Sequence, residues 1–284
     1  MTRISSQRDT LLALKIRQKR FNQFRRGRVN SAKEVREDLI LQRNLSSRFS
    51  KILTRTFNKF VKVNAYLYGQ TGIFNPAVAA EGLEEDLRAQ ALDHYKRIFR
   101  AVYIKNEEKY RGLYKDRSIY VFGRVQDFDA LVEQHFGVRE NFLVNISNRM
   151  AVRIFRRIQI LREENMTLEE ISRALAQEFA PIGRARAALI ARTETHGAAT
   201  AANWTYHKKV ADEFGVNMKK KWVATVDDRT RSHHSDANGQ VVGMEESFVV
   251  DGVNMKYAGD PAGGAKNVIN CRCQVVYVDE EDEF

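Results

Sequence analysis

The sequence predicts an α+β protein, in which a long-helical N-terminal region is followed by a small mixed α+β C-terminal domain. Two observations carry this prediction. Apolar residues recur at spacings of three and four over the first two thirds of the chain, whereas from Asn217 onward they alternate, and glycine and asparagine become common. With 284 residues and 43% hydrophobic content, the chain can build the core of one large domain or two ordinary ones. We place a helical region at residues 1–140 and the α+β domain at residues 141–284.

The first half of the chain predicts three long helices. Ser31 and Glu34 form a capping-box pattern, in which each side chain can accept a hydrogen bond from a backbone N–H of the first turn. The helix that begins there is expected to stop near Gly69, and a third helix is expected over residues 141–164, which are rich in arginine. The apolar stripes of the first two helices are Val35, Leu39, Leu45, Phe49, Ile52, Leu53, Phe57 and Phe60, and Leu83, Leu87, Ala91, Tyr95, Ile98 and Val102.

Two further helices are expected between Thr167 and Val210. Thr167 and Glu170 repeat the capping-box pattern at the start of a short helix. Pro181 and Gly183 are expected to end that helix, because proline and glycine interrupt helices. The helix after them should pack closely through its small residues, which are Ala198, Ala199, Ala201 and Ala202.

Short strands are predicted in the last quarter of the chain. Met218, Trp222, Ala224 and Val226 lie at even spacing, which is typical of a strand with one buried face. The segments "QVVGM", "SFVV" and "CQVVYV" are expected to be further strands joined by turns, with a turn at Asn238-Gly239. Trp222 is expected to pack in the core of this domain.

The charge of the chain predicts a polyanionic partner. The net charge is +11 and the pI about 9.6, so the surface attracts polyanions in a salt-dependent way. One segment is dense in basic residues with Phe21 and Phe24 between them, and we expect it to bind double-stranded DNA non-specifically. A solvated amphipathic helix is the alternative. The basic residues of this segment are Arg17, Lys19, Arg20, Arg25, Arg26 and Arg28.

Several classes of protein are disfavoured by the composition. No run of about 18 apolar residues exists, and the N-terminal residues lack the apolar core of a secretory signal, so we expect no membrane partner. Two cysteines in 284 residues do not make a disulfide framework. We therefore expect the protein to be made in a reducing cytosol.

The two cysteines lie one residue apart, at Cys271 and Cys273. In a strand their side chains would point to the same face, where they could bind a metal together with His233 or His234 from an expected turn. Two cysteines and one or two histidines match a tetrahedral Zn²⁺ site, although the usual Cys-x-x-Cys pair is absent. The alternative is a pair of small buried hydrophobic residues.

A series of motif blocks resembles the phage head morphogenesis family typified by protein F of phage Mu. The blocks are "ARTETHGAA" (191–199), "KWVATVDDRTRSHH" (221–234), "NG" (238–239), "EESF" (245–248), "GDP" (259–261) and "NCRC" (270–273). Their order and spacing resemble the family over about residues 145–278, roughly half of the chain. The first 140 residues lie outside the resemblance.

The resemblance implies a minor head protein of a tailed bacteriophage, acting in head assembly and in DNA packaging or ejection. Such a protein binds the portal protein, contacts the major capsid or scaffolding protein, and lies in the virion, inside the capsid near the portal, after assembly in the host cytoplasm. The resemblance also implies a set of structural motif residues and no catalytic residue. These are Arg192, Thr193, Glu194, Trp222, Asp228, Arg229, Thr230, Arg231, His234, Gly239, Asn270, Cys271, Arg272 and Cys273.

One departure from the family pattern bears on metal binding. In the family that this chain resembles, many members carry Cys-Pro-x-Cys where this chain has Arg231-Ser-His-His234. An arginine cannot ligate a metal. We therefore expect no cofactor, with zinc at Cys271, Cys273 and His234 as the weaker alternative. The cysteines should then be reduced and packed beside the His234 ring, and Arg231 should donate to carbonyls or carboxylates nearby.

Two rival functions remain at this point. A nuclease could use the histidine, arginine and glutamate side chains for acid–base work and phosphate stabilisation, but no spacing fixes a base beside a nucleophile. Residues 166–192 have the length of a helix-turn-helix, but the long leading helices and the NCRC end do not suit a DNA-binding regulator. We expect the chain not to be an enzyme. The residues that a nuclease could use are Arg192, Glu194, His196, Arg231, His233 and His234.

Overall fold

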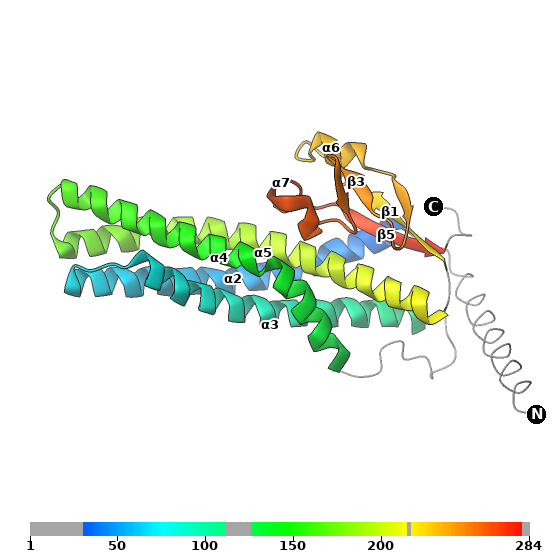
Figure 1. Ribbon diagram of the computed structural model, residues 1–284, viewed down its shortest axis with the longest axis horizontal. Helices are drawn as coiled ribbons and strands as arrows, with labels where there is room; N and C mark the ends of the chain where they lie inside the picture. The colour runs from blue at the N-terminus through cyan, green and yellow to red at the C-terminus, as the bar shows by residue number, and fades with distance from the viewer. Residues whose placement is uncertain (1–30, 112–125, 215–216, 280–284) are drawn as a thin grey trace, which may run out of the picture. The chain divides into compact units, whose positions relative to one another are not determined.

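The structure is a computed structural model that describes residues 31–111, 126–214 and 217–279 (Figure 1). The chain forms two compact units, each built from several segments of the sequence. Unit 1 comprises Met1–Ile40, Ile98–Phe128 and His196–Phe284, and unit 2 comprises Leu41–Arg97 and Asp129–Thr195. Among the described helices, none combines the length and the apolar character needed to cross a membrane.

Four long helices dominate the fold, and the spacing of apolar residues predicts the first three of them. They are α2 (Ser31–Thr71), α3 (Pro76–Arg111), α4 (Gln126–Glu163) and α5 (Leu168–Phe214) (Figure 1). Unit 2 takes segments from all four, and their apolar faces make its core. Buried residues of this core include Phe49, Leu53, Phe57, Leu83, Leu87, Ala91, Met150, Ala151, Ile154, Leu175, Phe179 and Ala187.

The ends of these helices follow local signals. Helix α2 ends at Thr71, two residues beyond the predicted stop, and Gly72 follows with φ +67°, a conformation that glycine adopts without strain. The capping box at Thr167 is confirmed, because the Thr167 backbone N–H donates to Glu170 Oε2 at 2.8 Å and the Glu170 N–H donates to Thr167 Oγ1 at 3.3 Å.

The prediction that Pro181 and Gly183 end a helix is wrong, because α5 continues through both residues. Pro181 and Gln177 lie on the exposed side of the helix, where water can satisfy the Gln177 carbonyl that the proline cannot bond. Gly183 faces α2, and a Cβ atom there would lie 3.2 Å from the Cβ of Phe57. Its glycine therefore permits a close approach of two helices within unit 2.

Unit 1 contains the strands. A three-stranded antiparallel sheet has the order β2-β1-β5, from β2 (Val241–Gly243), β1 (Met218–Val223) and β5 (Gln274–Asp279). A hairpin pairs β3 (Phe248–Val250) with β4 (Val253–Met255). The α+β class is confirmed, and the three predicted strand segments correspond to β2, β3 and β5. Strand β4 was not predicted.

Strand β1 has one fully buried face, as its alternation predicts. Met218 and Trp222 are 3% and 0% exposed, so the prediction that Trp222 packs in the core is confirmed. Lys220 shares that face and is also buried, and its Nζ donates to the Lys256 carbonyl at 2.7 Å. The strand ends at Val223, so its extension to Val226 is wrong, and Val226 is 81% exposed in the turn that follows.

Short helical segments connect the strands of unit 1. They are α6 (Ser232–Asp236), the 3₁₀ helix η1 (Pro261–Gly263) and α7 (Gly264–Val268). The loop before η1 lies against α5, where Thr200 Oγ1 donates to the Ala258 carbonyl at 2.6 Å. Ala198, Ala199, Ala201 and Ala202 are at most 3% exposed, which confirms the predicted close packing of this small-residue segment.

Candidate functional site

The turn between β1 and α6 is organised by Asp227. Its carboxylate accepts hydrogen bonds from the Arg229 backbone N–H at 3.1 Å and from Thr230 Oγ1 at 3.0 Å, which is an Asx-turn arrangement. Thr230 Oγ1 also contacts the Thr225 carbonyl. Thr225 Oγ1 in turn donates to the Arg272 carbonyl at 2.9 Å, so this turn is tied to the segment that holds both cysteines.

A bidentate ion pair makes the second connection between these segments. Arg272 Nη1 and Nη2 lie 2.5 and 2.7 Å from the two carboxylate oxygens of Asp227. This fork geometry is the strong form of an arginine–carboxylate pair. The hydrogen bonds from Arg272 hold the pKa of Asp227 well below its usual range, with smaller contributions from Thr230 and the Arg229 N–H.

Arg231 makes the third connection, whereas the side chains of Asp228 and Arg229 in the same turn point to solvent. Arg231 Nη2 donates to the Ile269 carbonyl at 2.6 Å, which confirms the prediction that this arginine donates to a nearby carbonyl. The side chains of Asp228 and Arg229 are 91% and 80% exposed, with a contact of 4.0 Å between them. Asp227 therefore occupies the position in the network for which the sequence favoured Asp228.

His234 joins the two cysteines in the interior of unit 1. Its Nδ1 lies 3.3 Å from Cys273 Sγ and 3.7 Å from Cys271 Sγ, and all three residues are buried. The indole of Trp222 packs against the imidazole at 5.9 Å between ring centres. The prediction that the cysteines pack beside this ring is confirmed, although His234 lies in α6 rather than in a turn, and the cysteines precede β5 rather than belong to it.

The pKa values of the two thiols are shifted in opposite directions. Cys271 donates toward Cys273, which raises the pKa of Cys271 and lowers that of Cys273. Burial raises the pKa of Cys271 further, and the hydrogen bond from His234 lowers that of Cys273 further. The three side chains thus contact one another through His234 Nδ1, whereas the buried Nε2 of His234 has no hydrogen-bond partner among the described residues.

The donor set of this cluster fits a tetrahedral metal ion only in part. His234, Cys271 and Cys273 bring three ligand atoms within 4.8 Å of one another, and no other group of this kind occurs in the described part of the chain. Structural zinc takes four protein ligands, whereas three ligands leave an open position. The cavity beside them measures about 20 Å³, enough for one water molecule, and Arg229, Arg231 and Arg272 line it. Arg231 lies beside the three ligand atoms and cannot itself bind a metal ion.

Two predicted turn residues position this cluster. Gly239 has φ +85°, and its N–H donates to the Trp222 carbonyl at 2.9 Å. The preceding Asn238 accepts the Ala224 N–H through Oδ1 at 2.9 Å, so the turn is bonded to the end of β1. Asn270 also adopts a positive φ, +58°, immediately before Cys271. This left-handed residue redirects the chain from α7 into the NCRC segment.

Three predicted motif residues on α5 belong to unit 2. Glu194 is 3% exposed and accepts hydrogen bonds from Arg139 Nε at 2.9 Å and from the Tyr95 hydroxyl at 2.6 Å. Thr193 is buried and Arg192 is exposed. The described partners of Glu194 therefore come from α3 and α4, and Arg139 was not anticipated from the sequence.

The predicted DNA-binding residues Arg17, Lys19, Arg20, Arg25, Arg26 and Arg28 lie outside the residues that the structure describes. Their role stays a prediction.

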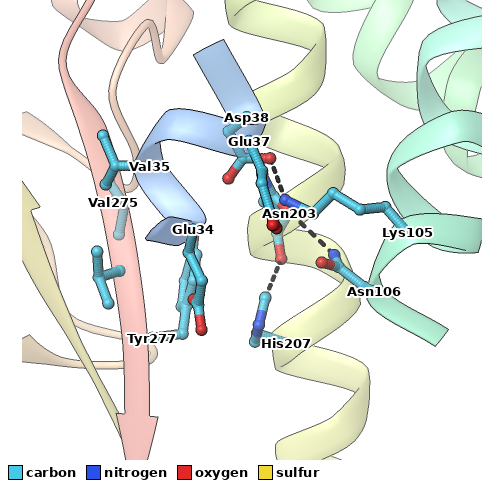
Figure 2. A pocket seen from close by; sticks show the side chains of 11 residues that line it. Glu34, Val35, Glu37, Asp38, Lys105, Asn106, Asn203, His207, Val275 and Tyr277 are labelled. Carbon is cyan, nitrogen blue, oxygen red and sulfur yellow. Dashed lines mark hydrogen bonds and ion pairs between the residues drawn. The ribbon is translucent and has the colours of Figure 1, made fainter. Parts of the chain in front are cut away.

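A polar cavity in unit 1 was not predicted. It measures about 40 Å³ and is lined mainly by polar residues from α2, α3 and α5, together with Tyr277 and three valines from α2 and β5 (Figure 2). Asn106 Nδ2 donates to Asn203 Oδ1 at 2.9 Å, Lys105 pairs with Asp38, and His207 stacks on Tyr277 at 4.1 Å. Polar groups of this kind hold buried water.

The position of Asn106 on an apolar stripe is a sequence signal for part of this cavity. Asn106 follows Ile98 and Val102 at helical spacing, so it occupies a buried position on an apolar stripe. A polar residue in such a position needs a hydrogen-bond partner in the interior. Nothing in the sequence identifies that partner as Asn203, since the two residues are 97 positions apart.

Comparison with known proteins gives a family match for the region that holds the cluster. The model of the family described as Phage Mu protein F like protein matches residues 163–276. The chain is 38% identical over 96 residues to the Minor head protein GP7 of Bacillus phage SPP1, a match that covers 33% of this chain and 30% of GP7.

A second relative carries the name of an enzyme. The chain is 30% identical over 148 residues to the NAD(+)--arginine ADP-ribosyltransferase EFV of Enterococcus faecalis (strain ATCC 700802 / V583). That match covers 52% of this chain and 28% of the enterococcal protein. The matches thus span less than a third of the length of either relative. No solved structure matches the chain.

Proposed function

We propose that this chain acts in the head of a tailed bacteriophage. The premise is that residues 163–276 belong to the phage Mu protein F like family of minor head proteins. In this proposal the chain associates with the portal protein and with the major capsid or scaffolding protein during assembly. It then remains inside the capsid near the portal, where it contacts double-stranded DNA non-specifically and takes part in packaging or ejection.

One observation carries the structural part of this proposal: the family motif residues bond to one another and leave no room for a substrate. Asp227, Arg231 and His234 each make a direct contact with residues 269–273. The cavity beside them holds about one water molecule, whereas sites for small molecules are several hundred Å³ in size. The cluster is thus a scaffold that closes unit 1.

The same contacts argue against the nuclease alternative. Arg231 Nη2 donates to the Ile269 carbonyl, and His234 is 2% exposed, so its imidazole does not reach a phosphate at the surface. Glu194 is occupied by Arg139 and Tyr95. Purified protein is therefore expected to leave duplex DNA and RNA uncut. A cleavage activity that disappears in the His234→Ala variant would replace the scaffold proposal with the enzyme.

The proposal includes closure of the cluster without a tightly bound metal. Arg231 stands where many relatives carry a cysteine, and its guanidinium is bonded to the Ile269 carbonyl. The Cys271–Cys273–His234 hydrogen bonds then supply the connection that a zinc ion would supply in a four-cysteine relative. Zinc on these three ligands remains the alternative.

Quantitative mass spectrometry of phage particles tests the proposed function. DNA-filled virions and empty procapsids would be purified from a phage whose genome encodes this chain, and peptides from residues 31–279 would be counted relative to the portal protein. We expect a small fixed ratio to the portal in both particles, and loss from procapsids assembled without portal. Absence from both particles would contradict the proposal.

A further inference from the structure

Helices α4 and α5 contain two facing segments that carry only one sign of charge. Residues 149–162 of α4 hold five arginines and no acidic residue, and residues 179–192 of α5 hold three arginines and no acidic residue. Neither segment contains a lysine. A solvent-exposed helix face usually carries acidic and basic side chains together, often as i,i+4 pairs. Simple exposure to water therefore does not explain segments whose only charged residues are arginines.

The arginines of α4 form a row on one side of the helix. Arg149, Arg153 and Arg156 follow one another at i, i+4 and i+7, and all three side chains are exposed. The row is about 10 Å long at the rise of an α-helix. In the part of the chain that the structure describes, no carboxylate lies within ion-pair distance of any of the three.

Helix α5 brings a fourth arginine to this row. The 2.8 Å ion pair between Arg157 and Glu178 fixes how the two antiparallel helices lie, and Arg153 Cζ lies 5.9 Å from the centre of the Phe179 ring. Eight residues back along α4 from Arg157 is Arg149, and eight residues forward along α5 from Glu178 is Arg186. These two arginines therefore lie at the same level of unit 2.

The crowding of positive charge is strong enough to affect Arg186 itself. Partial burial lowers the pKa of its guanidinium, and the nearby charges of Arg149 and Arg153 lower it further. Like charges held together without a counter-charge destabilise the folded protein, so an anionic ligand that neutralises them would be bound favourably.

We propose that Arg149, Arg153, Arg156 and Arg186, which we name the arginine row, form a contact surface for the phosphate backbone of double-stranded DNA. The inference rests on the proposed function, which makes DNA a partner but assigns it no surface among the described residues. Exposure of the α4 members, the absence of paired carboxylates and the exclusive use of arginine all favour phosphate, because the guanidinium fork matches phosphate oxygens. Contacts of this kind are independent of DNA sequence.

A charge-matched pair of variants tests the arginine row. The first variant changes Arg149, Arg153 and Arg156 to Gln in the full chain, and the second changes Arg48, Lys51 and Arg55 of α2 to Gln. All six side chains are exposed and without an ion pair among the described residues, so both variants lose three positive charges from the surface of one helix. Glutamine forms helices nearly as well as lysine and arginine, so equal thermal unfolding midpoints are expected.

Fluorescence anisotropy with a 30-base-pair duplex of mixed sequence would be measured at several salt concentrations. We expect the α4 variant to bind about tenfold or more weakly and the slope of log K against log salt to fall by about three, one for each lost phosphate contact. The α2 variant should keep most of the affinity. Equal losses in both variants, or an undiminished affinity in the α4 variant, would overturn the assignment.

A competition experiment separates DNA from an acidic protein as the partner. Polyglutamate should displace the labelled duplex from the wild-type chain far less well than unlabelled DNA does, because carboxylates lack the charge density of the duplex. Equal competition would overturn the assignment to phosphate. Neither result depends on whether the chain is present in virions, so failure of this inference is distinguishable from failure of the proposed function.

Discussion

In unit 2, long apolar helix faces hold the structure together around one buried ion pair, whereas the motif cluster of unit 1 is held by hydrogen bonds between short segments. The Arg139–Glu194 pair is buried, and the Tyr95 hydroxyl donates to the same carboxylate, whereas apolar residues such as Leu87 and Phe179 make the rest of the core. The cluster from Thr225 to Cys273 has only short helical and strand segments, and side chains bond carbonyls, carboxylates and thiols. The motif residues of unit 1 thus supply side-chain hydrogen bonds where the segments are too short for periodic apolar packing.

The largest effect is expected where the cluster meets its apolar core. Trp222 is fully buried, and its indole contacts both His234 and Phe248. The Trp222→Ala variant should lower the free energy of unfolding by about 3–5 kcal/mol, because it removes a large buried side chain and leaves a cavity. Chemical denaturation measures this directly. An unchanged midpoint would mean that the cluster does not depend on its core.

Breaking the buried ion pair of unit 2 should have a somewhat smaller effect. The Arg139→Ala substitution removes the positive charge that pairs with the buried carboxylate of Glu194. The hydrogen bond from the Tyr95 hydroxyl to this carboxylate remains. We expect a loss of about 3 kcal/mol, since an uncompensated buried charge is costly. Arg97→Ala is the control, because Arg97 and Asp93 form an exposed i,i+4 pair that is worth about 0.5 kcal/mol at most. Equal losses of unfolding free energy in the two variants would contradict the claim that the buried ion pair contributes more to stability than the exposed pair.

These first two predictions differ in how far the sequence foresaw them. The burial of Leu83, Leu87, Ala91 and Tyr95 could be predicted, because helical spacing places such residues on one face. Trp222 could be predicted in the same way from strand alternation. Arg139 could not be paired with Glu194, since 55 residues separate them and nothing local links the two.

Most members of the motif cluster and two of its contacts could be predicted, whereas the Asp227–Arg272 pair could not. The sequence placed Arg231, His234 and the two cysteines in one structural unit, and the structure brings them together. The expected set of motif residues contained Asp228 instead of Asp227, because only the fold decides which carboxylate faces Arg272. The role of Gly183 was misread, because a glycine that lets two helices approach has the same local signal as one that ends a helix.

Removal of either thiol should weaken the cluster moderately. Cys271→Ser and Cys273→Ser should each lower the free energy of unfolding by about 1–2 kcal/mol, because serine packs less well in the apolar surroundings of His234. Thermal unfolding of the two variants would give this value. The double variant should lose less than the sum of the two, since the side chains share one hydrogen-bonded group. Strict additivity would indicate that the cysteines act independently.

The smallest expected effect concerns the pH dependence of stability. Arg272 holds the folded-state pKa of Asp227 below its unfolded value near 4, so the ion pair contributes stability above that pH. The contribution is lost as the pH falls below about 4, because the unfolded chain then binds a proton that the folded chain does not. Asp227→Asn should therefore flatten the decline of stability in acid. An identical pH profile for wild type and variant would show that this pair is not a source of the decline.

Elemental analysis of the purified full-length protein, before and after chelation, tests most directly the claim that the cluster is closed by the protein's own contacts. Protein prepared with zinc in the growth medium would be measured for zinc per chain and for its thermal unfolding midpoint. We predict far less than one zinc per chain and an unchanged midpoint after chelation. One zinc per chain, removed by the chelator together with the fold of unit 1, would contradict the account and assign Cys271, Cys273 and His234 to a metal centre.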